Sequence, residues 1–410
     1  MRFLIPLLCA VSLSAADVSR LRELERTNRI FELRRALQQP GWSQADTLFY
    51  RAVVSARLGD EKAGIEDLRR FLAASPESAL AREAWEELAS AYARIGHYRE
   101  AADAWTQALS LTSRNEPERA ENENTQALYA ALADVAPQTV EFAGDPTVLA
   151  FSNHLGSWNV PVEINGHRAD WIFDTGANLS TVSESGAREM GLTVTETKAY
   201  VRGSTGVKNG LHIAVANGLR LGPTRLNNVV LLVVSDQSLY ISPFHYRIQG
   251  ILGLPVIRAL GVSQMSAKGL LLIGAGKAAA QQEPDLFFDE LRSIVEIRHG
   301  GQPLQLYLDT GATRTDSYPS IRSALSGDEQ VHLRKKREKA AGAGGMVRRA
   351  VVKIPQLRFE LAGRNIDLKN VDLFYKQPSG GLQYYDGVLG MDALASGFTL
   401  DYRTMRLLVN

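Results

Sequence analysis

The sequence predicts a multidomain protein in which an all-α helical repeat domain precedes a mainly-β domain of two similar lobes. Three observations support this fold class. Ala, Leu, Glu and Arg are frequent from residue 17 to about 135, as they are in helices. After Pro137, short β-branched runs alternate with Gly, Asn and Pro, which is typical of strands and turns. Within this β region one unit occurs twice, and 410 residues are too many for a single ordinary core.

The composition excludes several classes of function. The chain has 46 Lys and Arg against 45 Asp and Glu, a formal net charge of +1, which does not favour nucleic acid or a membrane surface as a partner. The 7 His residues form no HExxH or comparable cluster, so we expect no metal. We also expect no cofactor, because the GAGK sequence at 274–277 lacks the first Gly and the Ser or Thr of a phosphate-binding loop.

The first 16 residues resemble a secretory signal peptide. Arg2 provides a positive start, an apolar stretch follows, and Ser14-Ala15-Ala16 offers small residues for cleavage before Asp17. We therefore expect an exported protein, periplasmic or extracellular, without a transmembrane span after signal removal. An uncleaved anchor and a buried first helix are the alternatives. Cys9 is the only cysteine and leaves with the signal, which excludes a thiol enzyme.

The predicted helical domain, residues 17–135, contains a repeat pattern. A loose unit lies between Leu48 and Pro76, and a clearer one begins at Ala84. Two such units cannot bury their faces alone, so we expect capping helices at about 18–38 and 122–135, with a plain helical bundle as the alternative. The polar stretch 113–124 predicts a loop or an interrupted helix. The clearer unit resembles a tetratricopeptide repeat at Trp85, Leu88, Ala89, Tyr92, Gly96, Tyr98, Ala101, Trp105 and Ala108, and this resemblance implies a protein partner.

The β region contains a duplication. WIFDTGANLSTVS starts at Trp171 and LYLDTGATRTDSY starts at Leu306, and each follows a strand and a Gly turn. The second turn is expected to be two residues longer than the first. An apolar-apolar-Gly segment follows each motif at nearly the same spacing. We therefore predict a first lobe at 145–273, an inter-lobe linker at 274–285 and a second lobe at 286–410.

These motifs resemble those of the aspartic peptidases of the retropepsin and pepsin group. One Asp-Thr-Gly motif is a weak signal, whereas two copies with matched downstream segments are a strong one. The resemblance covers roughly 145–410, and the short lobes and the Ala after each Gly are closer to the retropepsin type. It implies a catalytic pair, Asp174 and Asp309, supported by Thr175, Gly176, Gly253, Thr310, Gly311 and Gly390.

Paired carboxylates suit peptide hydrolysis without a metal or a covalent intermediate. A base must take a proton from water, and an acid must give one to the carbonyl oxygen. Two carboxyl groups that share one proton can do both, and aspartic proteases are the standard example of such a pair. The titration belongs to the pair, so the sequence leaves open which aspartate is the base. A single Asp in such a turn could instead be only a turn cap.

The resemblance also implies a hairpin that covers the substrate. The stretch that starts at Tyr200 is one candidate and the basic stretch before Ala350 is the other, and the sequence leaves open whether one or both act. Tyr200 is not equated with the flap tyrosine of pepsin-like enzymes. The candidate flap residues are Gly203, Ser204, Thr205 and Gly206 in the first lobe and Gly344 and Gly345 in the second.

Two functional hypotheses differ in class. The first is an exported aspartic endopeptidase with a peptide or protein substrate, whose repeats recruit or orient a protein. The second is an inactive protease-like scaffold for a protein-binding repeat domain. The intact motifs favour the enzyme, since a degenerate copy is expected to lose Asp, Thr or Gly. Because both motifs lie in one chain, we expect a monomer rather than a dimer that pairs lobes between chains.

Overall fold

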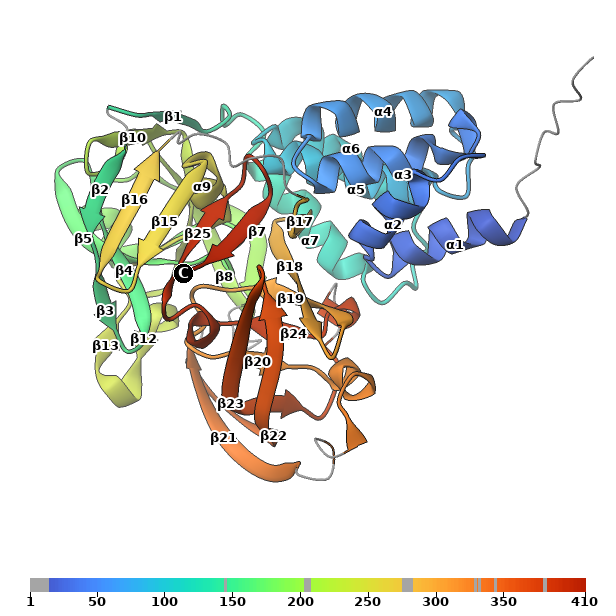
Figure 1. Cartoon of the computed structure of the whole chain (residues 1–410). Helices are drawn as coiled ribbons and strands as arrows, with labels where there is room; N and C mark the ends of the chain where they lie inside the picture. The colour runs from blue at the N-terminus through green and yellow to red at the C-terminus, as the bar shows by residue number, and fades with distance from the viewer. Residues whose placement is uncertain are drawn as a thin grey trace, which may run out of the picture.

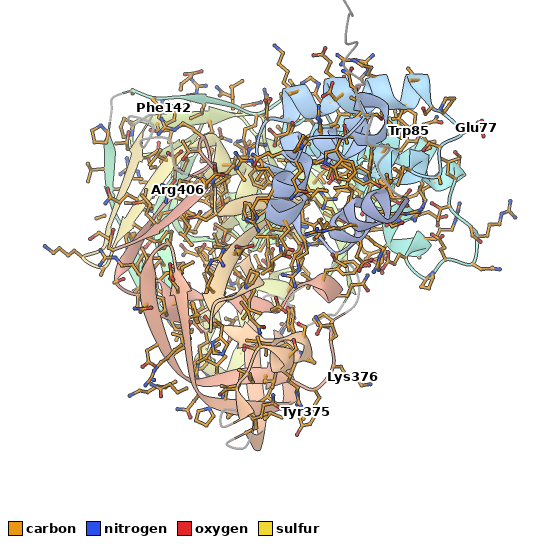
Figure 2. The ribbon with its side chains drawn as sticks, turned by 45° about the vertical axis from the view of Figure 1, so that its right-hand side comes forward. Glu77, Trp85, Phe142, Tyr375, Lys376 and Arg406 are labelled. Carbon is orange, nitrogen blue, oxygen red and sulfur yellow. The ribbon has the colours of Figure 1, made fainter. Side chains whose placement is uncertain are left out.

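The computed structural model describes residues 15–143, 146–202, 208–274, 283–327, 330, 333–342, 345–378 and 382–410. Figure 1 shows a helical domain on one side of two β lobes, as the fold class predicted. Figure 2 gives a second view, in which Trp85 lies in the helical domain, Phe142 beside the first lobe and Tyr375 at the far end of the second. None of the helices in the described part of the chain is both long and apolar enough to cross a membrane.

The helical domain is built from antiparallel neighbours with small residues at their contacts. Gly64 of one helix lies so close to Ala56 of the previous one that an added Cβ would be 2.6 Å from the Ala56 Cβ. The side chain of Asp60 caps the helix that contains Gly64 by accepting a hydrogen bond from the Ala63 N–H at 3.2 Å. The helices are α1 (Ala15–Arg26), α2 (Ile30–Leu37), α3 (Gln44–Arg57), α4 (Glu61–Ala74), α5 (Ala81–Arg94), α6 (Tyr98–Ser110) and α7 (Arg119–Ala131).

Of the loop or interrupted helix expected at 113–124, the structure has the interruption: α6 ends at Ser110 and α7 begins at Arg119. The guanidinium of Arg119 donates to the carbonyl oxygens of Leu109 and Thr112 at 3.2 and 2.8 Å. It therefore ties the first turn of α7 to the end of α6, a tertiary contact that polar composition alone does not reveal.

The first lobe is a sheet with the strand order β1-β10-β9-β4-β5-β14-β6-β11-β8-β7. It begins at Thr139, earlier than the predicted boundary at 145, and it carries the helices α8 (Glu184–Glu189) and α9 (Leu254–Ala259). Strand β3 pairs β4, and β12 (Tyr240–Ile241) pairs β13 (Tyr246–Arg247). The strands are β1 (Thr139–Glu141), β3 (Ser152–His154), β4 (Ser157–Ile164), β5 (His167–Phe173), β6 (Ser180–Ser183), β7 (Val194–Arg202), β8 (Lys208–Ala216), β9 (Leu219–Leu221), β10 (Thr224–Asn227), β11 (Val229–Val234) and β14 (Gly250–Leu252).

The second lobe repeats the central part of this arrangement, with the order β17-β18-β19-β24-β20-β23-β22-β21. In both lobes, the strand that ends at the motif aspartate pairs in parallel with the apolar-apolar-Gly strand. The strands are β17 (Leu286–Asp289), β18 (Arg292–His299), β19 (Gln302–Leu308), β20 (Asp316–Ser317), β21 (Arg334–Gly342), β22 (Gly345–Leu361), β23 (Arg364–Phe374) and β24 (Gly387–Leu389).

The turn before the second motif is not longer than the first, contrary to the expectation. Asn165-Gly166 and Gly300-Gly301 are both two-residue turns, and all four residues have positive φ values. Such turns match the twist of the flanking strands and favour Asn and Gly. The strands before the two turns, β4 and β18, are both eight residues long, and the strands after them, β5 and β19, are both seven.

A separate sheet joins the lobes, with the order β2-β16-β15-β25-β26. Strand β2 (Thr147–Ala150), β15 (Val262–Ser266) and β16 (Leu270–Gly274) come from the first lobe. Strands β25 (Gly397–Asp401) and β26 (Arg406–Val409) come from the second. Because β15 pairs β25 over five residue pairs, the two lobes share backbone hydrogen bonds and not only side-chain contacts.

Candidate active site

Each motif turn starts where a buried strand ends. Phe173 and Leu308 are the last residues of β5 and β19, and both are fully buried. The Asp174 N–H donates to the Leu252 carbonyl at 3.0 Å, and the Asp309 N–H donates to the Leu389 carbonyl at 3.1 Å. The parallel pairing therefore extends through both aspartates and fixes where their side chains begin.

Gly253 and Gly390 let the apolar-apolar-Gly segments pass directly behind the turns. A Cβ on Gly253 would lie 2.5 Å from the carbonyl carbon of Leu179, and one on Gly390 would lie 2.4 Å from that of Arg314. Main-chain hydrogen bonds of 2.8 Å, from Leu254 to Ala177 and from Met391 to Ala312, close the two contacts. Larger residues at either Gly would push the turn away from its sheet.

The two turns meet face to face. A Cβ on Gly176 would lie 2.5 Å from the Asp309 Cγ, and one on Gly311 would lie 2.4 Å from the Asp174 Cγ. Each carboxyl group thus lies directly against the glycine of the opposite turn. The structure brings together the aspartates and the glycines that the resemblance identified.

Thr175 and Thr310 lock this arrangement. The Thr175 Oγ1 accepts from the Thr310 N–H at 3.1 Å and donates to the Leu308 carbonyl at 2.8 Å. The Thr310 Oγ1 accepts from the Thr175 N–H at 3.0 Å and donates to the Phe173 carbonyl at 2.7 Å. All four bonds cross between the lobes, and both threonines are buried, so water does not compete with them.

Burial and mutual proximity perturb both carboxyl groups. Burial first, and the charge of Asp309 second, raise the pKa of Asp174 well above its ordinary value. Burial also raises the pKa of Asp309, against hydrogen bonds from Ala312, Asp174 and Gly311 that lower it. Two carboxylates this close cannot both ionise easily, so the pair retains a proton at a pH where isolated aspartates have none.

The hydrogen bonds to the two aspartates are unequal. The Asp309 Oδ1 accepts from the N–H groups of Gly311 and Ala312, both at 2.9 Å. Among the N–H groups of the described residues, the Asp174 Oδ1 accepts only from that of Gly176, at 2.7 Å, although the more distant Ala177 N–H also lowers the pKa of Asp174. Donors to a carboxylate favour its ionised form, so the geometry favours a charged Asp309 and a protonated Asp174.

Tyr307 is a functional candidate that the sequence reasoning treated only as a strand residue. Its side chain lies on the same strand face as Asp309, and its hydroxyl donates to the Gly176 carbonyl at 2.5 Å, across the lobe interface. Burial, and then the charge of Asp309, raise the pKa of Tyr307 well above its usual value. The corresponding first-lobe residue is Ile172, which cannot form such a bond. A tyrosine two positions before one motif aspartate was the available signal.

The candidate flap residues 203–206 and Gly344 lie outside the described residues. Gly345 begins β22 at the end of its pairing with β21. The flanking strands of the first-lobe candidate, β7 and β8, form an antiparallel pair.

Parts of the chain are similar to known proteins. Residues 160–256 and 295–393 match the family model for aspartyl protease, and residues 82–115 match that for the tetratricopeptide repeat. The chain is also similar to a solved structure, that of a retropepsin-like aspartic protease from Rickettsia conorii, with 18% sequence identity and a TM-score of 0.24. The match covers 33% of this chain and 92% of the Rickettsia chain. No curated protein matches.

In fold and in site, the chain resembles an aspartyl protease with both lobes in one chain. The matched segments contain one motif aspartate each, and the helical domain that precedes them contains a tetratricopeptide repeat. The resemblance inferred from the two Asp-Thr-Gly-Ala motifs and from the repeat around Trp85 is thereby confirmed.

Proposed function

We propose that the protein is an aspartic endopeptidase, in which Asp174 and Asp309 activate a water molecule for attack on a peptide bond. The observation that carries the proposal is the reciprocal contact of each carboxyl group with the opposite Gly, at 2.4 to 2.5 Å from an added Cβ. A structural turn cap needs no second carboxyl group, and burying two together is unfavourable unless they share a proton. The paired burial therefore supports catalysis over the inactive-scaffold alternative.

The unequal hydrogen bonds suggest how the pair divides the work. Asp309, whose charge two N–H donors stabilise, takes a proton from the attacking water. Asp174, which retains its proton, donates it to the carbonyl oxygen of the scissile bond. The C–O bond to water forms as the carbonyl π-bond opens to a tetrahedral diol. Asp309 then gives the proton that it took from water to the nitrogen, Asp174 takes a proton back from a diol hydroxyl, and the C–N bond breaks as that hydroxyl oxygen re-forms the C=O bond. Both aspartates then return to sharing one proton.

The test is the pair of variants Asp174→Asn and Asp309→Asn. An amide is nearly isosteric with the carboxyl group but supplies neither a base nor an acid, so each variant is expected to lose peptide hydrolysis by at least ~10³-fold. The double variant is expected to lose little more, because the pair acts as one unit. A folded single variant with near-normal hydrolysis would leave the protein-binding scaffold as the better reading.

We also propose that the enzyme is monomeric and exported. Both aspartates come from one chain, which supports a complete site without a second copy; activity that depends on dimer formation would contradict this. The sequence of residues 1–16 supports export, with Asp17 as the mature N-terminus. N-terminal sequencing of the protein from cell fractions checks this, and retention of Met1 would refute cleavage.

A further inference from the structure

Helix α7 of the helical domain holds the lobe-1 hairpin, by which we mean strands β7 and β8. The side-chain amide of Asn124 bonds to both backbone groups of Tyr200. Its Nδ2 donates to the Tyr200 carbonyl at 3.0 Å, and its Oδ1 accepts from the Tyr200 N–H at 2.8 Å. A side-chain amide carries both a donor and an acceptor, so it can take the place of the backbone N–H and C=O that a neighbouring strand would offer to Tyr200.

The position of this contact in the sheet makes it important. Strand β7 is the last strand of the first-lobe sheet, with β8 as its strand neighbour among the described residues. The pairing of β7 with β8 is irregular between Glu196 and Tyr200. Asn124 bonds the residue at which regular pairing resumes. An edge strand with interrupted pairing is weakly fixed by its own sheet, so the amide supplies a second anchor.

Apolar packing connects the same hairpin to the helical domain and to the aspartates. Ala199, Leu211 and Ile213 of the hairpin are at most 4% exposed and belong to the same buried cluster as Tyr129, about one and a half turns of helix beyond Asn124. This cluster also contains Tyr307, whose hydroxyl bonds to Gly176. One buried cluster therefore extends from α7 and the hairpin to Tyr307, which bonds to the motif turn of Asp174.

The helical domain is itself anchored on the second lobe. The Asn28 Nδ2 donates to the Tyr385 hydroxyl at 3.0 Å, and the Gln305 Nε2 donates to the Asn28 carbonyl at 2.9 Å. The Tyr385 hydroxyl donates to Asp289 at 2.6 Å. All of these groups are buried. The helical domain thus contacts the second lobe through Asn28 and the lobe-1 hairpin through α7, which lies beside β7 in Figure 1.

We propose that Asn124 is a positioning residue for peptide binding and that the helical domain is a built-in part of the peptidase. This inference rests on the proposed function. Asn124 fixes the backbone of Tyr200, which holds the lobe-1 hairpin and its buried side chains in register against the cluster that contains Tyr307. The partner of this surface of the repeat domain is accordingly the protease region of the same chain.

The experiment compares Asn124→Ala and Asn124→Asp with Gln126→Ala in the full-length protein. Asn124→Asp keeps the acceptor for the Tyr200 N–H but turns a second acceptor toward the Tyr200 carbonyl. Gln126 lies on the same helix and bonds to Thr106 inside the helical domain at 3.3 Å, so it is a matched control. Hydrogen exchange of residues 194–202 and the KM and kcat for a short peptide are measured.

Asn124→Ala is expected to speed exchange in 194–202 and to raise KM about tenfold, with kcat changed by less than about threefold. Asn124→Asp is expected to do at least as much, and Gln126→Ala to do neither. Wild-type exchange or a wild-type KM in folded Asn124→Ala would overturn the proposal. If the wild type hydrolyses no peptide, the proposed function fails, whereas the exchange of 194–202 still shows whether Asn124 holds the hairpin.

Discussion

Adding one methyl group at Gly311 is expected to separate the two carboxyl groups. The Cβ of Gly311→Ala would lie 2.4 Å from the Asp174 Cγ, whereas ordinary contacts begin at 3.4 Å, so one group must move by about 1 Å. Gly311 does not have a positive φ, so the backbone can accommodate Ala and the contact alone causes the effect. A misplacement of about 1 Å at reacting groups costs roughly 100-fold in rate. We therefore expect kcat/KM to fall by about that factor.

The assay is steady-state hydrolysis of a peptide, with the thermal unfolding midpoint measured in parallel. Gly327→Ala is the control, because among the described residues, its chain neighbours aside, no heavy atom lies within 4 Å of its added Cβ. Gly176→Ala, at 2.5 Å from the Asp309 Cγ, is expected to behave like Gly311→Ala. A folded Gly311→Ala protein with kcat/KM within about threefold of the wild type would show that the turns do not need this close approach.

Two further predictions concern Tyr307 and Glu25. Tyr307→Phe removes the cross-lobe hydrogen bond but keeps the ring, so kcat/KM is expected to fall about tenfold. The control Ile172→Val is expected to have little effect. Equal kcat/KM for Tyr307→Phe and the wild type would mean that the bond does not position Gly176. Burial raises the pKa of Glu25 to about 7, from an ordinary value of 4.5, against the charge of Arg57. Between these values the folded state binds more protons than the unfolded state, so this group's stabilising contribution is complete below pH 4.5 and is lost as the pH rises through 7. Glu25→Gln should therefore reduce the fall in the thermal unfolding midpoint between pH 5 and pH 8. Substitution of the exposed Glu23 by Gln should leave this fall unchanged. Identical pH profiles of Glu25→Gln and the wild type would contradict the raised pKa of Glu25.

The features that the sequence predicted are local ones. The strand, the aspartate and the glycine of each motif are adjacent, so their pattern is visible in a single stretch such as that from Trp171. The repeat around Trp85 is visible for the same reason, because its spacing follows from helices that pack on their sequence neighbours. Duplication then made two weak local signals into one strong prediction.

The features that the sequence did not reveal depend on contacts between distant segments. Asn124 is an ordinary polar residue on an acidic stretch, and nothing nearby indicates that it bonds to Tyr200. The pairing of β15 with β25 joins residues around Met265 and Phe398, and alternating hydrophobicity identifies a strand but not its partner. Tyr307 differs from its counterpart Ile172, but the meaning of this difference is visible only once the two copies are known to face each other.

The differences between the two copies matter as much as their likeness. Two identical turns would present the same donors to both aspartates, and the shared proton would have no preferred site. Here the Asp309 Oδ1 accepts from two N–H groups and the Asp174 Oδ1 from one. The hydrogen bond between the two carboxyl groups also raises the pKa of Asp174 and lowers that of Asp309. A hydroxyl at Tyr307 bonds to the first turn, whereas Ile172 offers the second turn no equivalent. Because both copies lie in one chain, each aspartate can be substituted without changing the other, and the roles of acid and base can be assigned separately. In a dimer of identical subunits, one substitution changes both aspartates together.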